Sequence, residues 1–381
     1  MSNKFKPTAS QKKAIEGKGS LLVSAAAGSG KTATLVDRVI KKLTDPDQMY
    51  KITDLLMVTF TKAASAEMRS RISMALGEKL SQDISLSLRK HLREQTVLLP
   101  KADISTVDSF CKKLISDNFD ALDLPPDFKI IPEPQLNIMK EQALSDTVEH
   151  FLTVRKKEFT ALMKLLGTDS RLENIRASIS QLYEYMQTLP FPEEWREDCI
   201  AMYRNFDSVA GSPWGQWILQ SLYSRFNSTA DLLQAVIQEI SADEVLSQKR
   251  GGDLKEGLNF CLEMLDLIQG SSYDLICSKV QECQKIKWSK NLSKNDIYDP
   301  LLQEKTERAR EKYHKTVEKA KKNLLFSEKD CKRVAKELTP FIELLFEAAE
   351  YYSELLREAK SEKNYLDFAD IEHLTLKLLA V

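Results

Sequence analysis

The residues with the clearest chemistry lie near the N-terminus, where Gly28, Gly30, Lys31 and Thr32 stand in a loop of small side chains. Glycines let backbone N–H groups turn toward one centre, and the start of a helix adds more, so such a loop can cradle phosphate oxygens. A lysine at this place reaches the β- and γ-phosphates of a nucleotide, and the threonine hydroxyl after it can bind Mg²⁺. The usual pattern of such a P-loop opens with glycine, where this chain has Ala25. The segment therefore predicts a nucleoside triphosphate site.

A strand, the loop and a helix are expected to position these groups. Residues 20–24 form a short apolar run typical of a buried strand, and residues 34–43 carry apolar side chains at helical spacing. The alternative is a strand-to-helix turn that only needs small residues. A short helix over residues 7–17 precedes the strand and carries Gln11, whose amide can donate to and accept from an adenine edge. The set expected to hold ATP and Mg²⁺ is Gln11, Ala25, Ala26, Ala27, Gly28, Ser29, Gly30, Lys31 and Thr32, with Lys31 and Thr32 as catalytic residues and Thr32 as the magnesium ligand.

Two further apolar segments, 54–60 and 102–107, read as strands that end in hydroxyl side chains and run into helices over 65–76 and 109–118. Ligands of parallel α/β sheets bind at the carboxyl ends of the strands. There Phe60 could stack on a base while neighbouring hydroxyls and a lysine hold phosphates. The alternative is that Phe60 belongs to the core and the threonines cap helices. The candidate nucleic-acid contacts are Thr59, Phe60, Thr61, Lys62, Ser105 and Thr106.

Three strands, each followed by a helix, predict a right-handed parallel sheet, so the fold class is α/β. From residue 135 to about 360 the apolar spacing is helical, which predicts a large all-helical insertion. Gly251-Gly252 and residues 271–288 are expected to be loops or short helices. Residues 304–322 are dense in both charges, which favours a solvated helix with paired side chains over a basic DNA-binding face. Trp288, flanked by lysines, is a stacking candidate whose alternative is packing.

Composition adds limits. A chain of 381 residues suggests two or three domains, and a net charge of −1 means that any nucleic-acid site must be local. The six cysteines include no CxxC pair, which argues against a zinc site or a disulfide framework and favours reduced thiols. The N-terminus lacks a signal peptide, and no run approaches the roughly 20 apolar residues of a membrane span. We therefore expect a cytoplasmic chain with no membrane contact.

The motifs come in a recognisable order. Gln11, residues 25–32, residues 58–69 and residues 104–111 resemble the Q motif and motifs I, Ia and Ib of superfamily 1 helicases of the UvrD/Rep kind. Within that family the chain is similar to the AddA group, the helicase–nuclease components of AddAB complexes. This second resemblance depends on residues 109–111, 122–130 and 365–373. A sister group of UvrD-like helicases remains the alternative.

The resemblance implies a P-loop RecA-like parallel sheet, domain 1A, over residues 1–130, a helical domain 1B over 131–360 and a return to 1A over 361–381. It implies a 3′-to-5′ ATP-dependent DNA helicase, with exonuclease activity in the full-length protein, that acts in double-strand break repair by homologous recombination. Its cofactors would be ATP and Mg²⁺. Its partners would be the single-stranded 3′ tail and duplex end of DNA and an AddB-type protein. At the return, Asp367 and Asp370 are expected to cap a helix rather than bind metal.

No apolar strand ending in Asp-Glu, the Walker B pattern, occurs in these 381 residues. The nearest acidic pair, Asp243-Glu244, lies in the helical region. We therefore expect an N-terminal fragment whose domain 1A stops before Walker B. A missing arginine finger typically costs about 10³–10⁵ in turnover, so the fragment should be inactive alone. The alternatives are a stand-alone DNA-binding or regulatory module with a degenerate nucleotide site, and a P-loop kinase with a helical lid.

Overall fold

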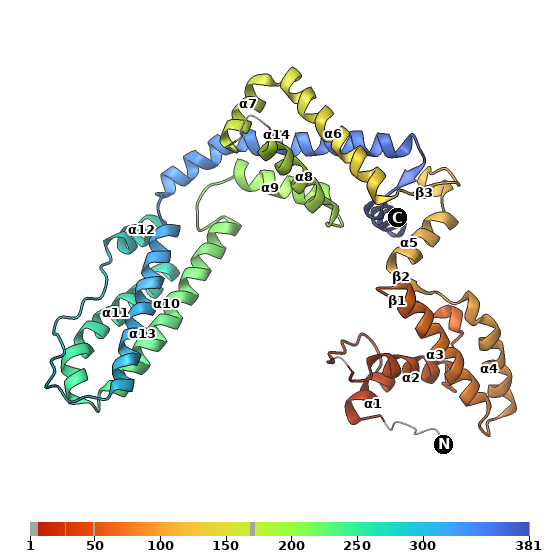
Figure 1. Cartoon of the computed structure of the whole chain (residues 1–381), viewed down its shortest axis with the longest axis horizontal. Coiled ribbons are helices and arrows are strands. Elements are labelled where there is room, and N and C mark those ends of the chain that lie inside the picture. The colour runs from red at the N-terminus through yellow and green to blue at the C-terminus, as the bar shows by residue number, and fades with distance from the viewer. Residues whose placement is uncertain (1–6, 27, 49, 168–171, 271, 381) are drawn as a thin grey trace. The chain divides into compact units, whose positions relative to one another are not determined.

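The chain divides into two compact units, each described here by itself (Figure 1). The computed structural model describes residues 7–26, 28–48, 50–167, 172–270 and 272–380. Unit 1 comprises Met1–Lys140 and Leu356–Val381, and unit 2 comprises Glu141–Leu355. Two helices, α6 (Glu133–Val154) and α14 (Glu328–Ser361), contribute residues to both units.

Unit 1 combines short parallel strands with helices. Apart from its parts of α6 and α14, its regular elements are α1 (Ala9–Glu16), α2 (Lys31–Leu43), β1 (Met57–Thr59), α3 (Lys62–Leu80), α4 (Leu86–Leu98), β2 (Ile104–Thr106), α5 (Val107–Asp117), β3 (Lys129–Ile130), β4 (Tyr365–Leu366) and α15 (Phe368–Leu379), with 3₁₀ turns at Ile52–Asp54, Leu99–Lys101 and Asp120–Leu122. The main core lies where α2, α3 and α4 meet, and it buries Leu43, Ile72 and Leu92 completely. This core fixes the helices that follow the candidate loop and the first strand.

The two strands predicted around residues 54–60 and 102–107 are confirmed in shortened form. β1 and β2 pair in parallel, with Met57 opposite Ile104 and Thr59 opposite Thr106. The predicted strand over residues 20–24 is wrong, because this segment is irregular and Leu22 is 99% exposed. Strand formation requires a neighbour for the backbone N–H and C=O groups, and no described residue pairs with this segment.

A second pair of strands, which the sequence pattern did not reveal, closes the return of the chain into unit 1. β3 and β4 pair in parallel, with Lys129 opposite Tyr365. They lie beside a small core that includes Ile115 and Ile371. α15 then begins with the predicted caps, because Asp367 and Asp370 form a reciprocal capping box.

Unit 2 is helical throughout its described residues, as predicted. Besides its parts of α6 and α14, its helices are α7 (Lys156–Leu165), α8 (Glu173–Gln187), α9 (Pro192–Arg204), α10 (Pro213–Ile240), α11 (Glu244–Gly270), α12 (Tyr273–Glu282) and α13 (Pro300–Asn323). The long helices α10, α11 and α13 lie side by side (Figure 1) around a core that buries Phe226, Leu254 and Met264.

The expected break at Gly251-Gly252 is wrong, because both glycines lie inside α11. Each glycine costs a helix about 1 kcal/mol, and the packing of this long helix against α10 offsets that cost. The other expectation for this region is confirmed, because α12 is a short helix and residues 283–288 are irregular. Among the described helices none is both long and apolar enough to cross a membrane.

Candidate nucleotide and nucleic-acid site

The glycine loop before α2 has the backbone conformation that glycine permits. Gly28 and Gly30 have φ angles of +77° and +82°, in the left-handed region where other residues are strained. Gly30 is the N-cap of α2 and offers no side-chain cap, whereas threonine side chains cap α1, α3 and α5. The first N–H groups of α2 therefore remain available for an anion, and the helix dipole favours negative charge there.

Lys31 folds back over this loop. Its Nζ donates to the carbonyl oxygens of Ala25 at 2.5 Å and Ala26 at 2.9 Å. The Ser29 hydroxyl also donates to the Ala26 carbonyl, at 2.7 Å. The ammonium group is thus held at the loop by neutral oxygens. A phosphate would offer it charged oxygens, which form stronger hydrogen bonds.

A cavity of about 340 Å³ opens beside the loop. This volume is within the range of about 300–1,000 Å³ usual for ligand pockets. None of its lining side chains is a carboxylate. Of the predicted nucleotide-site residues, Thr32 is exposed outside the lining, and Ala27 lies outside the described residues. The lining consists of Thr8, Ser10, Gln11, Ala14, Val23, Ser24, Ala25, Ser29, Lys31 and Thr34.

Gln11 is brought to the loop by α1. Its Oε1 accepts from the backbone N–H of Thr8 at 2.8 Å, and its Nε2 donates to the Ser29 carbonyl at 3.1 Å. A glutamine amide has two N–H donors and two acceptor lone pairs, so one of each is left for a ligand. A Cβ atom built on Gly30 would lie only 3.2 Å from Nε2 of Gln11. A side chain at residue 30 would therefore press on Gln11 as well as strain the backbone.

The described residues offer little to a metal ion by themselves. They contain no group of three or more His, Cys, Asp or Glu side chains that could hold one. Mg²⁺ commonly binds through one or two protein ligands together with substrate phosphates. The Thr32 hydroxyl, at the exposed start of α2, fits the part of a single protein ligand to a nucleotide-bound Mg²⁺.

The candidate nucleic-acid contacts meet at the carboxyl ends of β1 and β2. Thr59 stands opposite Thr106 in the register, and Phe60 follows with its side chain fully exposed. The expectation that the threonines cap helices is confirmed, since Thr61 caps α3 and Thr106 caps α5. The alternative that Phe60 belongs to the core is wrong.

The remaining candidates differ in how their side chains are used. The Thr59 hydroxyl donates to the Thr61 carbonyl at 3.0 Å, and the Ser105 hydroxyl donates to the Thr106 carbonyl at 3.1 Å. Lys62 is exposed at the first turn of α3. The aromatic ring of Phe60 and the ammonium of Lys62 are thus the more available groups at this edge.

Arg69 holds this edge in place, a role that sequence analysis missed. Its guanidinium donates to the carbonyl oxygens of Leu99 at 2.6 Å and Ile104 at 3.1 Å, and also to those of Pro100 and Ala102. The side chain therefore joins α3 to the segment that enters β2. Its only signal in the sequence is an arginine in the helix that follows the first strand, and a solvated helix shows the same pattern.

The charged helix of unit 2 is paired as the favoured interpretation predicted. Arg308, Arg310 and Lys315 each form an ion pair with a glutamate three or four residues earlier on α13. Trp288 lies between the guanidinium groups of Arg250 and Arg310, whose Cζ atoms are 4.5 and 4.8 Å from its ring. Its Nε1 also donates to Glu307 at 2.9 Å. Trp288 therefore packs within unit 2, and its ring is covered by cations rather than open to a base.

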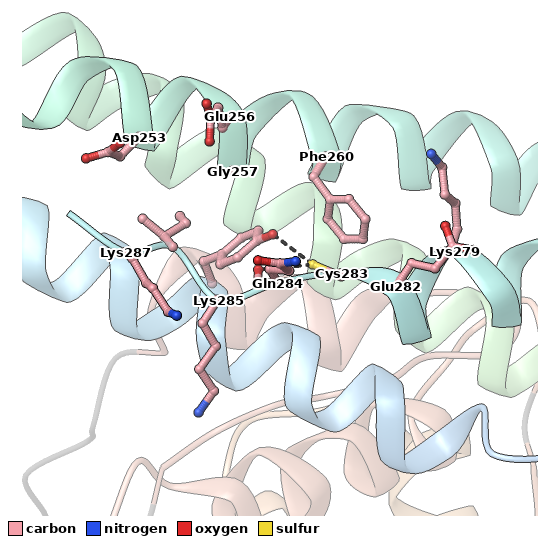
Figure 2. Close-up of a pocket in the computed structure, with 12 residues that line it drawn as sticks. Asp253, Glu256, Gly257, Phe260, Lys279, Glu282, Cys283, Gln284, Lys285 and Lys287 are labelled. Carbon is pink, nitrogen blue, oxygen red and sulfur yellow. Dashed lines mark hydrogen bonds between the residues drawn. The ribbon is translucent and has the colours of Figure 1, made fainter. Parts of the chain in front are cut away.

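A second cavity, of about 470 Å³, lies in unit 2 between α11, α12, α13 and the segment after α12 (Figure 2). Acidic and basic side chains alternate around it, and Phe260 and Tyr313 form its apolar side. The thiol of Cys283 lies 3.0 Å from the Tyr313 hydroxyl. Burial raises the pKa of the Cys283 thiol, which keeps it protonated and unreactive at neutral pH. This cavity therefore lacks the activated nucleophile that thiol catalysis would need.

Comparison with known proteins agrees with the motif order. The sequence profile of the UvrD/REP helicase N-terminal domain matches residues 7–381. Three curated relatives each bear a name that makes them the AddA component of an ATP-dependent helicase/nuclease. The chain is 33% identical to that of Desulfitobacterium hafniense (strain DSM 10664 / DCB-2) over 391 residues, covering 99% of this chain and 28% of the relative. It is 30% identical to that of Clostridium perfringens (strain 13 / Type A) over 378 residues, covering 95% and 28%. It is 31% identical to that of Bacillus pumilus (strain SAFR-032) over 367 residues, covering 94% and 29%. The chain thus spans less than a third of these relatives.

Proposed function

Because this chain belongs to the UvrD/REP helicase N-terminal domain family, we propose that it is the ATP- and DNA-binding N-terminal part of an AddA-type ATP-dependent helicase/nuclease. The observation that carries the proposal is the loop before α2, where two left-handed glycines, an uncapped helix start and Lys31 converge beside a cavity. The names of the relatives support the same activity.

In this proposal unit 1 is the RecA-like domain 1A and unit 2 is the inserted helical domain 1B. Sequence analysis placed the boundaries after residues 130 and 360, whereas the two units meet after residues 140 and 355. The parallel pairing of β1 with β2 and the helical content of unit 2 support this assignment.

The residues divide the proposed binding work between phosphates, base and DNA. The N–H groups at the start of α2 bind phosphate oxygens, and the Lys31 ammonium neutralises the terminal phosphates. The Thr32 hydroxyl holds the Mg²⁺ that accompanies ATP, and Gln11 reads the adenine edge. Phe60 stacks on a base of single-stranded DNA, with Thr59, Thr61, Lys62, Ser105 and Thr106 around the backbone.

The wider activity is also proposed. By its family the protein would move 3′ to 5′ on DNA at a duplex end, would pair with an AddB-type partner, and would serve double-strand break repair. The cavity beside the loop has no carboxylate to orient a water molecule. This chain by itself should therefore bind ATP and hydrolyse it at a negligible rate.

Equilibrium titration of the 381-residue chain with a fluorescent ATP analogue and Mg²⁺ tests the proposal. Lys31→Ala should weaken binding at least about tenfold, because it removes the charge that faces the terminal phosphates. Lys41→Ala is the matched control, since Lys41 lies in the last turn of the same helix. No binding by the unmodified chain, or equal binding by K31A, would refute the nucleotide site.

A second candidate is a DNA-binding or regulatory module whose nucleotide site is degenerate. The hydrogen bonds of Lys31 to loop carbonyls favour it, because they satisfy the ammonium without phosphate. The same titration separates the two candidates. A chain that binds single-stranded DNA but no ATP would be the module.

A further inference from the structure

The short helix α1 is held in place mainly by a side chain of α2. α1 has eight residues and none of its side chains is buried, so neither its length nor its packing stabilises it. Nη1 of Arg38 donates to the carbonyl oxygens of Ala14 at 2.6 Å and Gly17 at 2.9 Å, and more weakly to that of Ile15 at 3.4 Å. These bonds join the C-terminal end of α1 to the middle of α2.

The physical chemistry of a helix end explains why arginine suits this place. The last carbonyl groups of a helix lack partners within the helix and carry its negative dipole end. A cation that donates hydrogen bonds to them satisfies both conditions. Arg38 is partly buried, so water competes less for these bonds than on an open surface.

The other end of the argument is Gln11, on the same short helix. Its Nε2 bonds to the Ser29 carbonyl of the loop, so α1 carries one side chain into the cavity while Arg38 holds its far end. Arg38 is not among the residues that line the cavity. Any effect of Arg38 on a ligand there must therefore pass through α1.

We propose that Arg38 is a positioning residue that sets how strongly the site selects the base of its nucleotide, by fixing α1 and hence Gln11. This inference rests on the proposed nucleotide-binding function. Phosphates are bound by Lys31 and the start of α2, which Arg38 leaves unchanged. The base is read by Gln11, whose position depends on Arg38. Loss of Arg38 therefore weakens ATP binding and spares inorganic tripolyphosphate.

The experiment compares ATP with inorganic tripolyphosphate, by calorimetry, on the 381-residue chain and its variants. Arg38→Gln should weaken ATP binding about tenfold, as expected for the loss of one ordered polar contact, and change tripolyphosphate binding less than about twofold. Arg38→Lys, which keeps the charge but has a single nitrogen, should give a smaller loss. Arg89→Gln is the matched control, because Arg89 also donates to a carbonyl, that of Gln82 at 3.3 Å, from α4 and away from the cavity.

A double-mutant cycle with Gln11→Ala tests the route through α1. If Arg38 acts through Gln11, the variant with both substitutions should bind ATP no more weakly than Q11A alone. Amide hydrogen exchange across residues 12–17 should be faster in R38Q than in the unmodified chain. If R38Q does not fold, R38K gives the same comparison of the two ligands.

Three results would overturn the inference. They are equal losses for ATP and tripolyphosphate in R38Q, additive losses in the double mutant, and unchanged exchange across residues 12–17. If the unmodified chain bound no ATP, the proposed function would fail together with the inference. If it bound ATP and R38Q did so equally well, the inference alone would fail.

Discussion

At the scale of the residue, side chains near the loop and the strand ends differ in how far the fold already uses them. Thr61 and Thr106 are committed to capping helices, and Gln11 has used half of its hydrogen-bonding capacity. Phe60 is different, because its ring is fully exposed and belongs to neither core described for unit 1. An exposed aromatic ring at the end of a strand contributes nothing to folding there, which leaves ligand binding as its use.

Phe60→Ala should therefore lower affinity for single-stranded DNA without lowering stability. Stacking of one base on an aromatic side chain contributes about 1–3 kcal/mol. Fluorescence anisotropy with a labelled oligothymidylate would measure the loss, and thermal unfolding followed by circular dichroism would check stability. Phe191→Ala is the control, since Phe191 is also an exposed phenylalanine but lies in unit 2. Unchanged DNA affinity would remove Phe60 from the site.

At the scale of the element, the end of α14 and the start of α15 are joined by a buried charge cluster. Nζ of Lys360, which is only 3% exposed, donates to Asp367 at 2.8 Å and to Asp370 at 2.6 Å. Burial opposes the ionisation of both carboxyl groups. For Asp367 the charge of Lys360 and the hydrogen bonds together outweigh burial and lower the pKa, whereas for Asp370 burial prevails and raises the pKa. The cluster fixes the place where the chain returns to unit 1.

Lys360→Met should destabilise unit 1 by about 3–5 kcal/mol at neutral pH, because it leaves two carboxylates buried without their cation. Urea unfolding followed by circular dichroism would measure the loss. In the unmodified chain the lowered pKa of Asp367 makes this carboxyl lose its stabilising effect as pH falls through its folded-state pKa.

The sign of this dependence should reverse in K360M. Without the ammonium, burial raises the pKa of both carboxyl groups, so moderate acid should stabilise the variant. Lys363→Met, at an exposed position of the same segment, is the control. If K360M and the unmodified chain showed the same pH dependence, the cluster would have no electrostatic role.

At the scale of the whole molecule, the two units have separate cores and differ in how alkali should affect them. Unit 2 contains all four tryptophans, Trp195, Trp214, Trp217 and Trp288, so tryptophan fluorescence reports on it alone. In its core, burial raises the pKa of the Cys261 thiol from 9.0 to about 12, with a further rise from Cys283 nearby. The buried thiol stays protonated where the same thiol in an unfolded chain would ionise.

Unit 2 should therefore lose stability as pH rises from 9.0 toward about 12, because the unfolded state releases a proton that the folded state retains. The loss from this one group is about 1.4 kcal/mol per pH unit within that window. Guanidinium unfolding in reductant, followed by tryptophan fluorescence across the lower part of this window, would measure it. Cys261→Ala should be less stable at neutral pH through lost packing, but its stability should fall less steeply with pH. An identical slope in C261A would show that the thiol is not the group responsible.

Periodicity in the sequence was enough to predict most of the helices and two strands, because apolar spacing reflects which face packs on a core. It was not enough for the segment 20–24, whose Leu and Val residues predict a strand only if a neighbour exists to pair with it. It also missed β3 and β4, since strands of two residues are too short to show alternation. The members of the candidate site were predicted from motif order. Arg38 and Arg69 were not, because bonds to carbonyl groups distant in the sequence leave no local pattern.

The irregular segment 20–24 has a practical consequence for work on the isolated chain. Leu22 is 99% exposed, and the apolar neighbours Leu21 and Val23 are about half exposed. An extended apolar stretch with free backbone groups is a template on which a second polypeptide can add a strand, the first step toward aggregates. Concentrated samples should therefore self-associate through this stretch, and Leu22→Lys would place a gatekeeper there that keeps the protein monodisperse.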